Sequence, residues 1–429
     1  MRSYQVFIFK KYHLDPTTST LTCDYSYDDV VNFRETFKFD FTRHAYDPDV
    51  LDRAVQLLFF MAGVSYYKMY LAPEVKIEMG EIDDQLAAFL NTTYRHGLGE
   101  FCYVNSLDLI TKDIFVRTSD KRQPATRHNG TGMVIGLGGG KDSLASVELL
   151  RGQNAVATWS VGHQPQLAPL VERIGLPHYW VERIWDRKIL EHNSTGAYNG
   201  HVPISALFAC AGAVVAVLAG KRDIIVSNEH SANEPTLSYQ GVPINHQYSK
   251  SQAFETNFQA LLRAYFGDSI RYYSLLRPFS ELRIAEIFSS IGFAKYHDVF
   301  SSCNRAFVHD QTSLYWDGSC PKCAFVYLVL SPFIPEKDLM SLFGGKNLLL
   351  DPTLRETYEQ ILGISGDKPL ECVGEVKESR AAMRMAQSLN LDIQPYYFEL
   401  PPDYDFRLWQ SDNMPSEMRD VLRDATLNL

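Results

Sequence analysis

A short apolar run that leads into three glycines and a helix limits the fold of this chain more than any other segment. The run is Val134-Ile135-Gly136-Leu137, and the loop that follows consists of Gly138, Gly139, Gly140, Lys141, Asp142 and Ser143. Glycines let the backbone turn tightly and approach an anion, and the first turn of a helix presents unpaired N–H groups and the positive end of its dipole. The segment therefore predicts a phosphate-binding loop between a buried strand and a helix.

The chain after residue 132 alternates short apolar stretches with longer helical ones. Buried strands are predicted at residues 133–137, 155–160, 178–181, 223–227 and 270–274. Helices are predicted at residues 143–150, 165–174, 202–219, 251–266 and 281–291. This alternation is typical of an α/β protein with a parallel, doubly wound sheet that carries helices on both faces.

Composition and turn signals divide the chain into four parts. Residues 1–120 predict an N-terminal α+β domain, with a small antiparallel sheet and helices near 47–61 and 81–97. Residues 121–131 are polar and contain Pro124 and Gly130, as a linker does. Residues 132–331 form the predicted phosphate-binding domain, and residues 332–429 a mixed helical and loop-rich C-terminal segment.

Charge and cysteine content indicate where the chain works. The net charge is −10, whereas proteins that bind nucleic acid usually carry a basic face. The apolar run at residues 202–220 is close to the length of a membrane span, but its many small residues favour a buried core helix. The N-terminus lacks the apolar stretch of a signal peptide, and seven cysteines without framework spacing favour a reducing compartment. We expect a cytoplasmic protein that binds neither nucleic acid nor membrane.

The glycine loop lacks the spacing of the common P-loop and of dinucleotide-binding folds. It resembles the Ser-Gly-Gly-x-Asp-Ser loop of adenine nucleotide α-hydrolases, the pyrophosphatase-loop enzymes, with Gly138 at the position of the first serine. The resemblance implies that ATP binds here and is cleaved between its α and β phosphates. Lys141 adds positive charge and Ser143 can donate its hydroxyl to a phosphate oxygen, while Asp142 is expected to hold Mg²⁺ or to organise the loop.

Three further runs, at residues 193–201, 227–232 and 245–251, are dense in polar groups. The middle run directly follows a predicted strand, and ligands of open parallel sheets bind beyond the carboxyl ends of the strands. The other two precede helices, whose N-termini suit anions. Asn and Ser also cap helices, which is the simpler reading of any one of them. The candidate substrate-binding residues are Asn199, Gly200, Ser227, Asn228, Asn245, Gln247, Tyr248, Ser249 and Ser251.

Behind the glycine loop, the runs at 199–203, 227–229 and 245–251, together with 302–304, 320–326 and 371–375, resemble the MurL family. Members of that family are UDP-N-acetylmuramoyl-L-alanyl-L-glutamate epimerases of an alternative bacterial peptidoglycan route. The resemblance implies a small-molecule substrate, UDP-N-acetylmuramoyl-L-Ala-L-Glu. It also implies inversion of the terminal L-Glu to D-Glu with ATP and Mg²⁺ as cofactors.

A carboxylate makes its neighbouring α-proton hard to remove, because the carbanion would place a second negative charge beside the first. Joining that carboxylate to AMP removes its charge and turns the carbonyl into an electron sink. The implied order is adenylation, exchange of the α-proton, and hydrolysis. The acid/base candidates are His201, Glu229, His246 and Lys250; Lys250 could equally clamp a phosphate, and Glu229 could bind magnesium.

Cys320 and Cys323 form a Cys-x-x-Cys pair, and Cys303 lies upstream. Zinc usually requires a second ligand pair, for which His297, His309 and Asp317 are available at irregular spacing. The cluster is a zinc site, a reduced structural group or an acid/base thiol.

Three rival functions share parts of this pattern. A pyrophosphatase-loop enzyme that modifies a nucleobase or tRNA would share the loop but should carry a basic surface. An amide-forming enzyme often requires a glutaminase, and the chain has no N-terminal catalytic cysteine. A non-catalytic nucleotide sensor would need few of the polar clusters.

Overall fold

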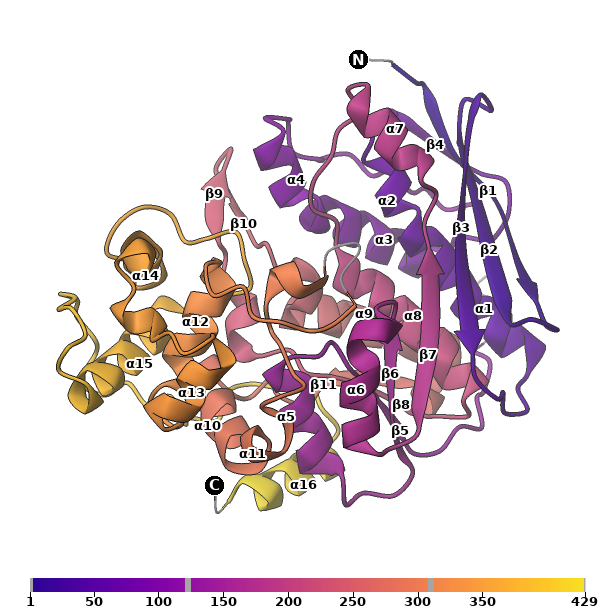
Figure 1. Ribbon diagram of the computed structural model, residues 1–429. Coiled ribbons are helices and arrows are strands. Elements are labelled where there is room, and N and C mark those ends of the chain that lie inside the picture. The colour runs from indigo at the N-terminus through magenta and orange to yellow at the C-terminus, as the bar shows by residue number, and fades with distance from the viewer. Residues whose placement is uncertain (1–2, 120–124, 308–311, 428) are drawn as a thin grey trace.

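The computed structural model describes residues 3–119, 125–307, 312–427 and 429. Its centre is a nine-stranded sheet in the order β11-β8-β5-β6-β7-β3-β2-β1-β4 (Figure 1). Five of its strands are parallel: β5 (Met133–Gly136), β6 (Val156–Val161), β7 (His178–Ile184), β8 (Asp223–Val226) and β11 (Arg271–Ser274). These are the five strands that the sequence predicts, and the α/β parallel sheet is confirmed.

The N-terminal strands extend the same sheet. They are β1 (Val6–Asp15), β2 (Thr20–Tyr27), β3 (Val31–Asp40) and β4 (Glu74–Ile77). The first three pair antiparallel as predicted, and β3 also pairs antiparallel with β7, with Phe39 opposite Val181. The predicted N-terminal sheet is therefore joined edge to edge to the parallel sheet. The predicted linker begins outside the described residues, at 121–124.

Helices cover both faces of the parallel strands, and successive residues of a strand point to opposite faces. Ile224 of β8 packs into one core with α1 (Pro48–Ala62), α3 (Asp84–Gly97), α8 (Ile204–Leu218) and α9 (Gln252–Phe266). Ile225, the next residue, packs into the other core with α5 (Lys141–Leu150), α6 (Gln164–Ile174), α10 (Glu281–Ile291) and α12 (Pro321–Leu330). Two cores separated by one sheet are what a doubly wound fold requires.

The apolar run at 202–220 forms α8, which lies in the protein interior against α1. Its small residues are needed for close packing, because a Cβ on Gly212 would stand 2.9 Å from Ile224 and 3.0 Å from Trp159. The prediction of a core helix is confirmed. Within the described residues, none of the helices combines the length and apolar character that crossing a membrane requires.

The C-terminal segment lies on the opposite side of the molecule from β1, β2 and β3 (Figure 1). It contains α13 (Glu336–Leu342), α14 (Arg355–Ile361), α15 (Val376–Leu389) and α16 (Ser416–Thr426), which join the core around α10 and α12. The remaining short elements are α2 (Val64–Tyr67), α4 (Gly99–Val104), α7 (Lys188–Ser194), α11 (Phe293–Tyr296) and the hairpin β9 (Leu237–Tyr239) and β10 (Val242–Ile244). The C-terminal segment thus closes one face of the sheet.

Candidate active site

A cavity of about 440 Å³ opens beyond the carboxyl ends of β5 and β8. These neighbouring strands mark the switch point of the sheet, since the chain runs from β5 to β6 on one side and returns to β8 on the other. Its lining includes Gly138, Gly140, Asp142 and Ser143 from the glycine loop, Ser227 and Asn228 after β8, and Lys250, Lys322 and Cys372 from later segments. The structure therefore brings the predicted phosphate loop and two of the polar runs to one cavity.

Two of the three glycines in the loop could not be replaced by a larger residue without backbone strain or a steric clash. Gly139 has φ of +87°, and a Cβ there would stand 3.0 Å from Leu167. A Cβ on Gly140 would stand 2.7 Å from the Oγ of Ser302. A Cβ on Gly138 would meet no atom within 4 Å, which suits the position that carries serine in related loops. The first glycine faces open space, and the other two are packed.

Lys141 is completely buried and does not line the cavity. Its Nζ lies 2.5 Å from Asp142 Oδ1 and forms a second ion pair with Glu281, which Lys322 approaches at 3.5 Å. Burial raises the pKa of the Glu281 carboxyl, but Lys141 and Lys322 outweigh it and hold the pKa below its ordinary value. Lys141 therefore pairs with one carboxylate of the loop and one buried carboxylate, and its charge does not point at the cavity. The Ser143 hydroxyl donates to Gly140 O at 3.0 Å.

Arg277 fixes the segment after β8 to the segment before α9. This fully buried side chain donates to the carbonyl oxygens of Glu229 at 2.6 Å and of Lys250 at 2.5 Å, and to Glu255 Oε2 at 3.1 Å. Glu229 is itself buried, and burial together with the nearby Glu281 raises the pKa of its carboxyl. Arg277 thus holds the backbone at Glu229 and at Lys250 in place.

Lys250 is the one predicted acid/base residue that lines the cavity. Its Nζ donates to Cys372 Sγ at 3.2 Å and to Gln247 Oε1 at 3.4 Å. Cys372 also raises the pKa of His246, whose Nδ1 forms a hydrogen bond with Glu100 Oε2. The predicted residues Lys250 and His246 therefore meet at a cysteine that the sequence prediction had not placed in the site.

His201 stands beside His246, with ring centroids 4.7 Å apart, and its Nδ1 lies 3.7 Å from the same Glu100 carboxylate. Burial lowers the pKa of His201 to about 4. Burial also acts to lower the pKa of His246, but Cys372 and Glu100 raise it to about 9. At neutral pH one imidazole is therefore charged and the other neutral. The two rings and the Glu100 carboxylate lie within 4.8 Å of one another, so the group could pass a proton or, with both rings neutral, hold a metal ion.

Seven of the nine predicted substrate-binding residues do not line the cavity; only Ser227 and Asn228 do. Ser251 caps α9 by accepting from Phe254 N at 3.2 Å, and Asn245 donates to Ala232 O at 2.8 Å. The ring of Tyr248 stacks on His96, and Ser249 is buried. Asn199 and Gly200 accept from Lys68 Nζ at 3.3 Å and 2.5 Å. The capping interpretation of Ser251 is correct, and the other groups hold the loops around the cavity.

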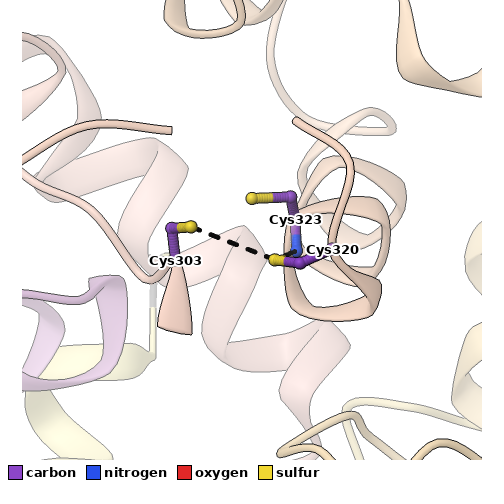
Figure 2. A group of neighbouring side chains, drawn as sticks. All are labelled: Cys303, Cys320 and Cys323. Carbon is purple, nitrogen blue, oxygen red and sulfur yellow. Dashed lines mark hydrogen bonds between the residues drawn. The ribbon is translucent and has the colours of Figure 1, made fainter. Parts of the chain in front are cut away.

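The three cysteines Cys303, Cys320 and Cys323 lie together at the start of α12 (Figure 2). Cys303 Sγ is 3.9 Å from Cys320 Sγ, and all three sulfur atoms lie within 4.8 Å of one another. Among the described residues no fourth ligand joins them, because Asp317 is held by Arg305 and Ser319. His309 lies outside the described residues. Cys303 also lines the cavity, so the cluster adjoins the site.

The residues of the site that were not predicted include Glu100, Glu281, Lys322 and Cys372. Lys322 and Cys372 stand in runs that the family resemblance includes, which is the signal that could have identified them. Glu100 and Glu281 occupy helix starts, where acidic residues are expected for local reasons. Nothing in their neighbourhood along the chain indicates a role in the site.

Comparison with known proteins places the chain in a family. Residues 1–275 match the family model described as MurL N-terminal domain, and residues 299–392 match the model of the MurL C-terminal domain. A Xanthomonas oryzae pv. oryzae protein is 37% identical, with 89% of this chain and 86% of that protein covered. A Micromonospora protein is 35% identical, with 90% and 87% covered. Both relatives are named UDP-N-acetyl-alpha-D-muramoyl-L-alanyl-L-glutamate epimerase. No solved structure matches the chain. With two family models that cover most of its length and relatives that match nearly end to end, the chain belongs to the MurL family.

Proposed function

We propose that this chain inverts the terminal L-Glu of UDP-N-acetylmuramoyl-L-Ala-L-Glu to D-Glu in the cytoplasm, driven by ATP. The observation that carries the proposal is the match to epimerases over about nine-tenths of the chain, 89% and 90% for two relatives. The site adds chemical support, since a glycine loop at a helix N-terminus faces a cavity that also holds proton-carrying groups. The activity would supply D-glutamate to peptidoglycan precursors.

ATP fits the glycine loop with its triphosphate against the first turn of α5. Gly138 leaves open space at the loop, and the N-terminus of α5 supplies unpaired N–H groups. Asp142 lines the cavity with its carboxylate partly exposed, and oxygen ligands of this kind suit Mg²⁺. Bound Mg²⁺ would neutralise phosphate charge during attack by the substrate carboxylate. Lys250 and Lys322 place two further positive charges at the cavity wall.

The substrate is larger than the cavity. A groove of about 1430 Å³ crosses β3 and β7, and His163 lines both the groove and the cavity. Its lining includes Arg43, which offers positive charge for a diphosphate, and Trp180, which offers a flat ring for a base, while Lys38 is paired with Glu182 of the same groove. We assign the UDP-sugar part of the substrate to this groove and the glutamate end to the cavity.

The chemistry follows from removing the carboxylate charge. Attack of the substrate carboxylate on the α phosphate of ATP releases pyrophosphate and forms an acyl-adenylate. The α-proton then leaves to a base, its electron pair moves into the carbonyl, and a proton returns to the opposite face. Water finally cleaves the mixed anhydride and releases AMP. Groups near the cavity that can hold a proton include Lys250 directly and His246 through Cys372.

The test is incubation of the purified protein with ATP, Mg²⁺ and the muramoyl dipeptide in deuterated water. We expect equal amounts of AMP and pyrophosphate, and D-Glu product that carries one deuterium at Cα. Product without α-deuterium would exclude proton exchange. If ATP is consumed with tRNA and not with the dipeptide, the proposal is wrong.

A further inference from the structure

Cys372 is held at the cavity from two sides. Its carbonyl oxygen accepts from Lys322 Nζ, and the neighbouring Glu371 Oε2 accepts from Lys322 N and Asn304 Nδ2, each at 3.0 Å. These bonds tie the turn at residues 371–373 to α12 and to the loop beneath the three cysteines. The backbone that carries Cys372 is thus held by Lys322, 50 positions from Cys372, and by Asn304, 67 positions from Glu371.

The charges around Sγ favour the thiolate. Lys250 Nζ lies 3.2 Å away, and His246 and Lys322 add two further positive charges that favour the ionised sulfur. Burial alone would raise the pKa of the Cys372 thiol, but these three cations lower it to about 7. At neutral pH the sulfur therefore exchanges readily between its protonated and ionised forms, as an acid/base group must.

Cys372, His246 and Glu100 form a connected thiol–imidazole–carboxylate chain. The carboxylate accepts from His246 Nδ1, and the imidazole and the thiol shift each other's pKa, as neighbouring groups do. In such chains the carboxylate fixes the orientation of the ring, and the ring activates the sulfur. The chain runs from α4, where Glu100 stands, to the cavity, so only its sulfur end reaches the reaction space.

Several other ionisable groups that line the cavity have partners of their own, and Tyr272, which also lines it, has a pKa raised by burial. Asp142 pairs with Lys141, and Lys322 contacts Glu281 and the Cys372 carbonyl. Cys303 belongs to the three-cysteine cluster, and His163 packs against Phe307. Of the predicted acid/base residues, Glu229, His201 and His246 do not line the cavity. A base that reaches the substrate glutamate is therefore best sought at Cys372 and its partner Lys250.

We propose that Cys372 is the catalytic residue that removes or returns the glutamate α-proton on one face, with His246 and Glu100 as positioning residues. The inference rests on the proposed function. As the Cα–H bond breaks, the proton passes to the thiolate Sγ and forms the S–H bond. The C–H electron pair moves into the activated carbonyl. A second donor, a protonated side chain or water, returns a proton to the other face, and the reverse reaction uses the same two groups.

The first test compares Cys372→Ala and Cys372→Ser with the unmodified protein. We expect inversion and α-deuterium incorporation to fall by about 10²-fold or more. Substrate-dependent AMP formation should stay within a few fold, because adenylation does not need the thiol. Cys102→Ser serves as the matched control, since Cys102 is a cysteine of α4 outside the cavity. It should leave both reactions unchanged.

The second test follows the thiol itself in the unmodified protein. Cys372 is the only cysteine of the seven that is not fully buried, so iodoacetamide should modify it first. The rate should rise with pH through about 7, and ATP with the dipeptide should protect the thiol. In His246→Gln the midpoint should move to higher pH, because one of the three groups that favour the thiolate is gone, with Lys250 and Lys322 remaining. A merely structural His246 would leave the midpoint unchanged.

The outcomes separate this inference from the proposed function. Absence of AMP formation with the dipeptide in the unmodified protein overturns the function itself. Normal AMP formation together with unchanged inversion in Cys372→Ala overturns only the role of the thiol. A glutamyl adduct on Cys372 detected by mass spectrometry would make the sulfur a nucleophile and also refute its role as a base.

Discussion

At the residue scale, the ion pairs beneath the glycine loop act as a unit. Glu281→Gln would leave Lys141 and Lys322 buried beside a neutral amide, and breaking a buried ion pair costs about 3–5 kcal/mol. We expect a loss of that order in the free energy of unfolding, measured by urea denaturation. Glu417→Gln is the control, because its pair with Arg271 is exposed and should contribute less than about 1 kcal/mol. Equal losses would contradict the role assigned to Glu281.

The same network marks the limit of prediction from single residues. The glycine loop was identifiable because its residues are contiguous and each has a local reason to be there. The partner of Lys141 was not, since Glu281 lies 140 positions away and meets it only after the sheet has formed. The sequence therefore predicted that Lys141 contributes its positive charge to phosphate binding, whereas the structure pairs Lys141 with two carboxylates.

The three-cysteine cluster carries a second residue-scale prediction. Tetrahedral zinc with Zn–S bonds of 2.3 Å places sulfur atoms about 3.8 Å apart, close to the 3.9 Å between Cys303 and Cys320. We expect about one zinc per chain by elemental analysis. Cys320→Ser should lose the metal while keeping the cap of α12, because a serine hydroxyl can accept from Cys323 N as the sulfur does. Cys102→Ser should retain zinc. Metal-free unmodified protein would rule out the zinc site and leave the reduced structural group and the acid/base thiol.

At the element scale, the same glycine-to-alanine change should have different effects at two positions of the glycine loop. Gly139→Ala requires φ of +87° from alanine, which costs about 1–2 kcal/mol, and its methyl group would crowd Leu167 and Phe307. Gly138→Ala adds its methyl group to open space. We expect ATP affinity, measured by calorimetry, to fall about tenfold in Gly139→Ala and little in Gly138→Ala. The reverse order would mean that the loop binds nucleotide in another conformation.

Elements with strong local signals were predicted well, and those defined by distant partners were not. The predicted helix at 281–291 has the bounds of α10, and the strand at 178–181 is only three residues short of the end of β7 at Ile184. The hairpin β9–β10 was not predicted. Each of its strands has three residues, which is too short for an alternation of apolar and polar residues to be recognised. Likewise, nothing local announces that β3 pairs with β7, since that pairing joins segments about 145 residues apart (Phe39 and Val181).

At the scale of the whole molecule, the continuous sheet ties the N-terminal strands to the candidate active site. The predicted boundary at 121–131 stays a prediction, but the packing that surrounds it crosses that point repeatedly. Helix α1 packs against α8, and one hydrophobic core includes residues from Phe7 to Tyr272. The carboxylate of Glu100, from the N-terminal part, also reaches His246. Folding of the first 120 residues and assembly of the site should therefore be coupled.

Coupled folding predicts a single cooperative unfolding transition for the whole chain, with equal calorimetric and van't Hoff enthalpies. Leu58→Ala removes a fully buried side chain of α1, which should cost about 2–5 kcal/mol and move that one transition as a whole. Loss of ATP binding should follow the same midpoint as loss of structure, because α1 supports α8 beneath the cavity. Leu190→Ala, at a side chain that is 56% exposed, should change little. Two separate transitions would contradict this prediction. If Leu58→Ala moved only one of them and ATP binding survived that transition, the N-terminal part would be an independent folding unit whose strands merely dock on β7.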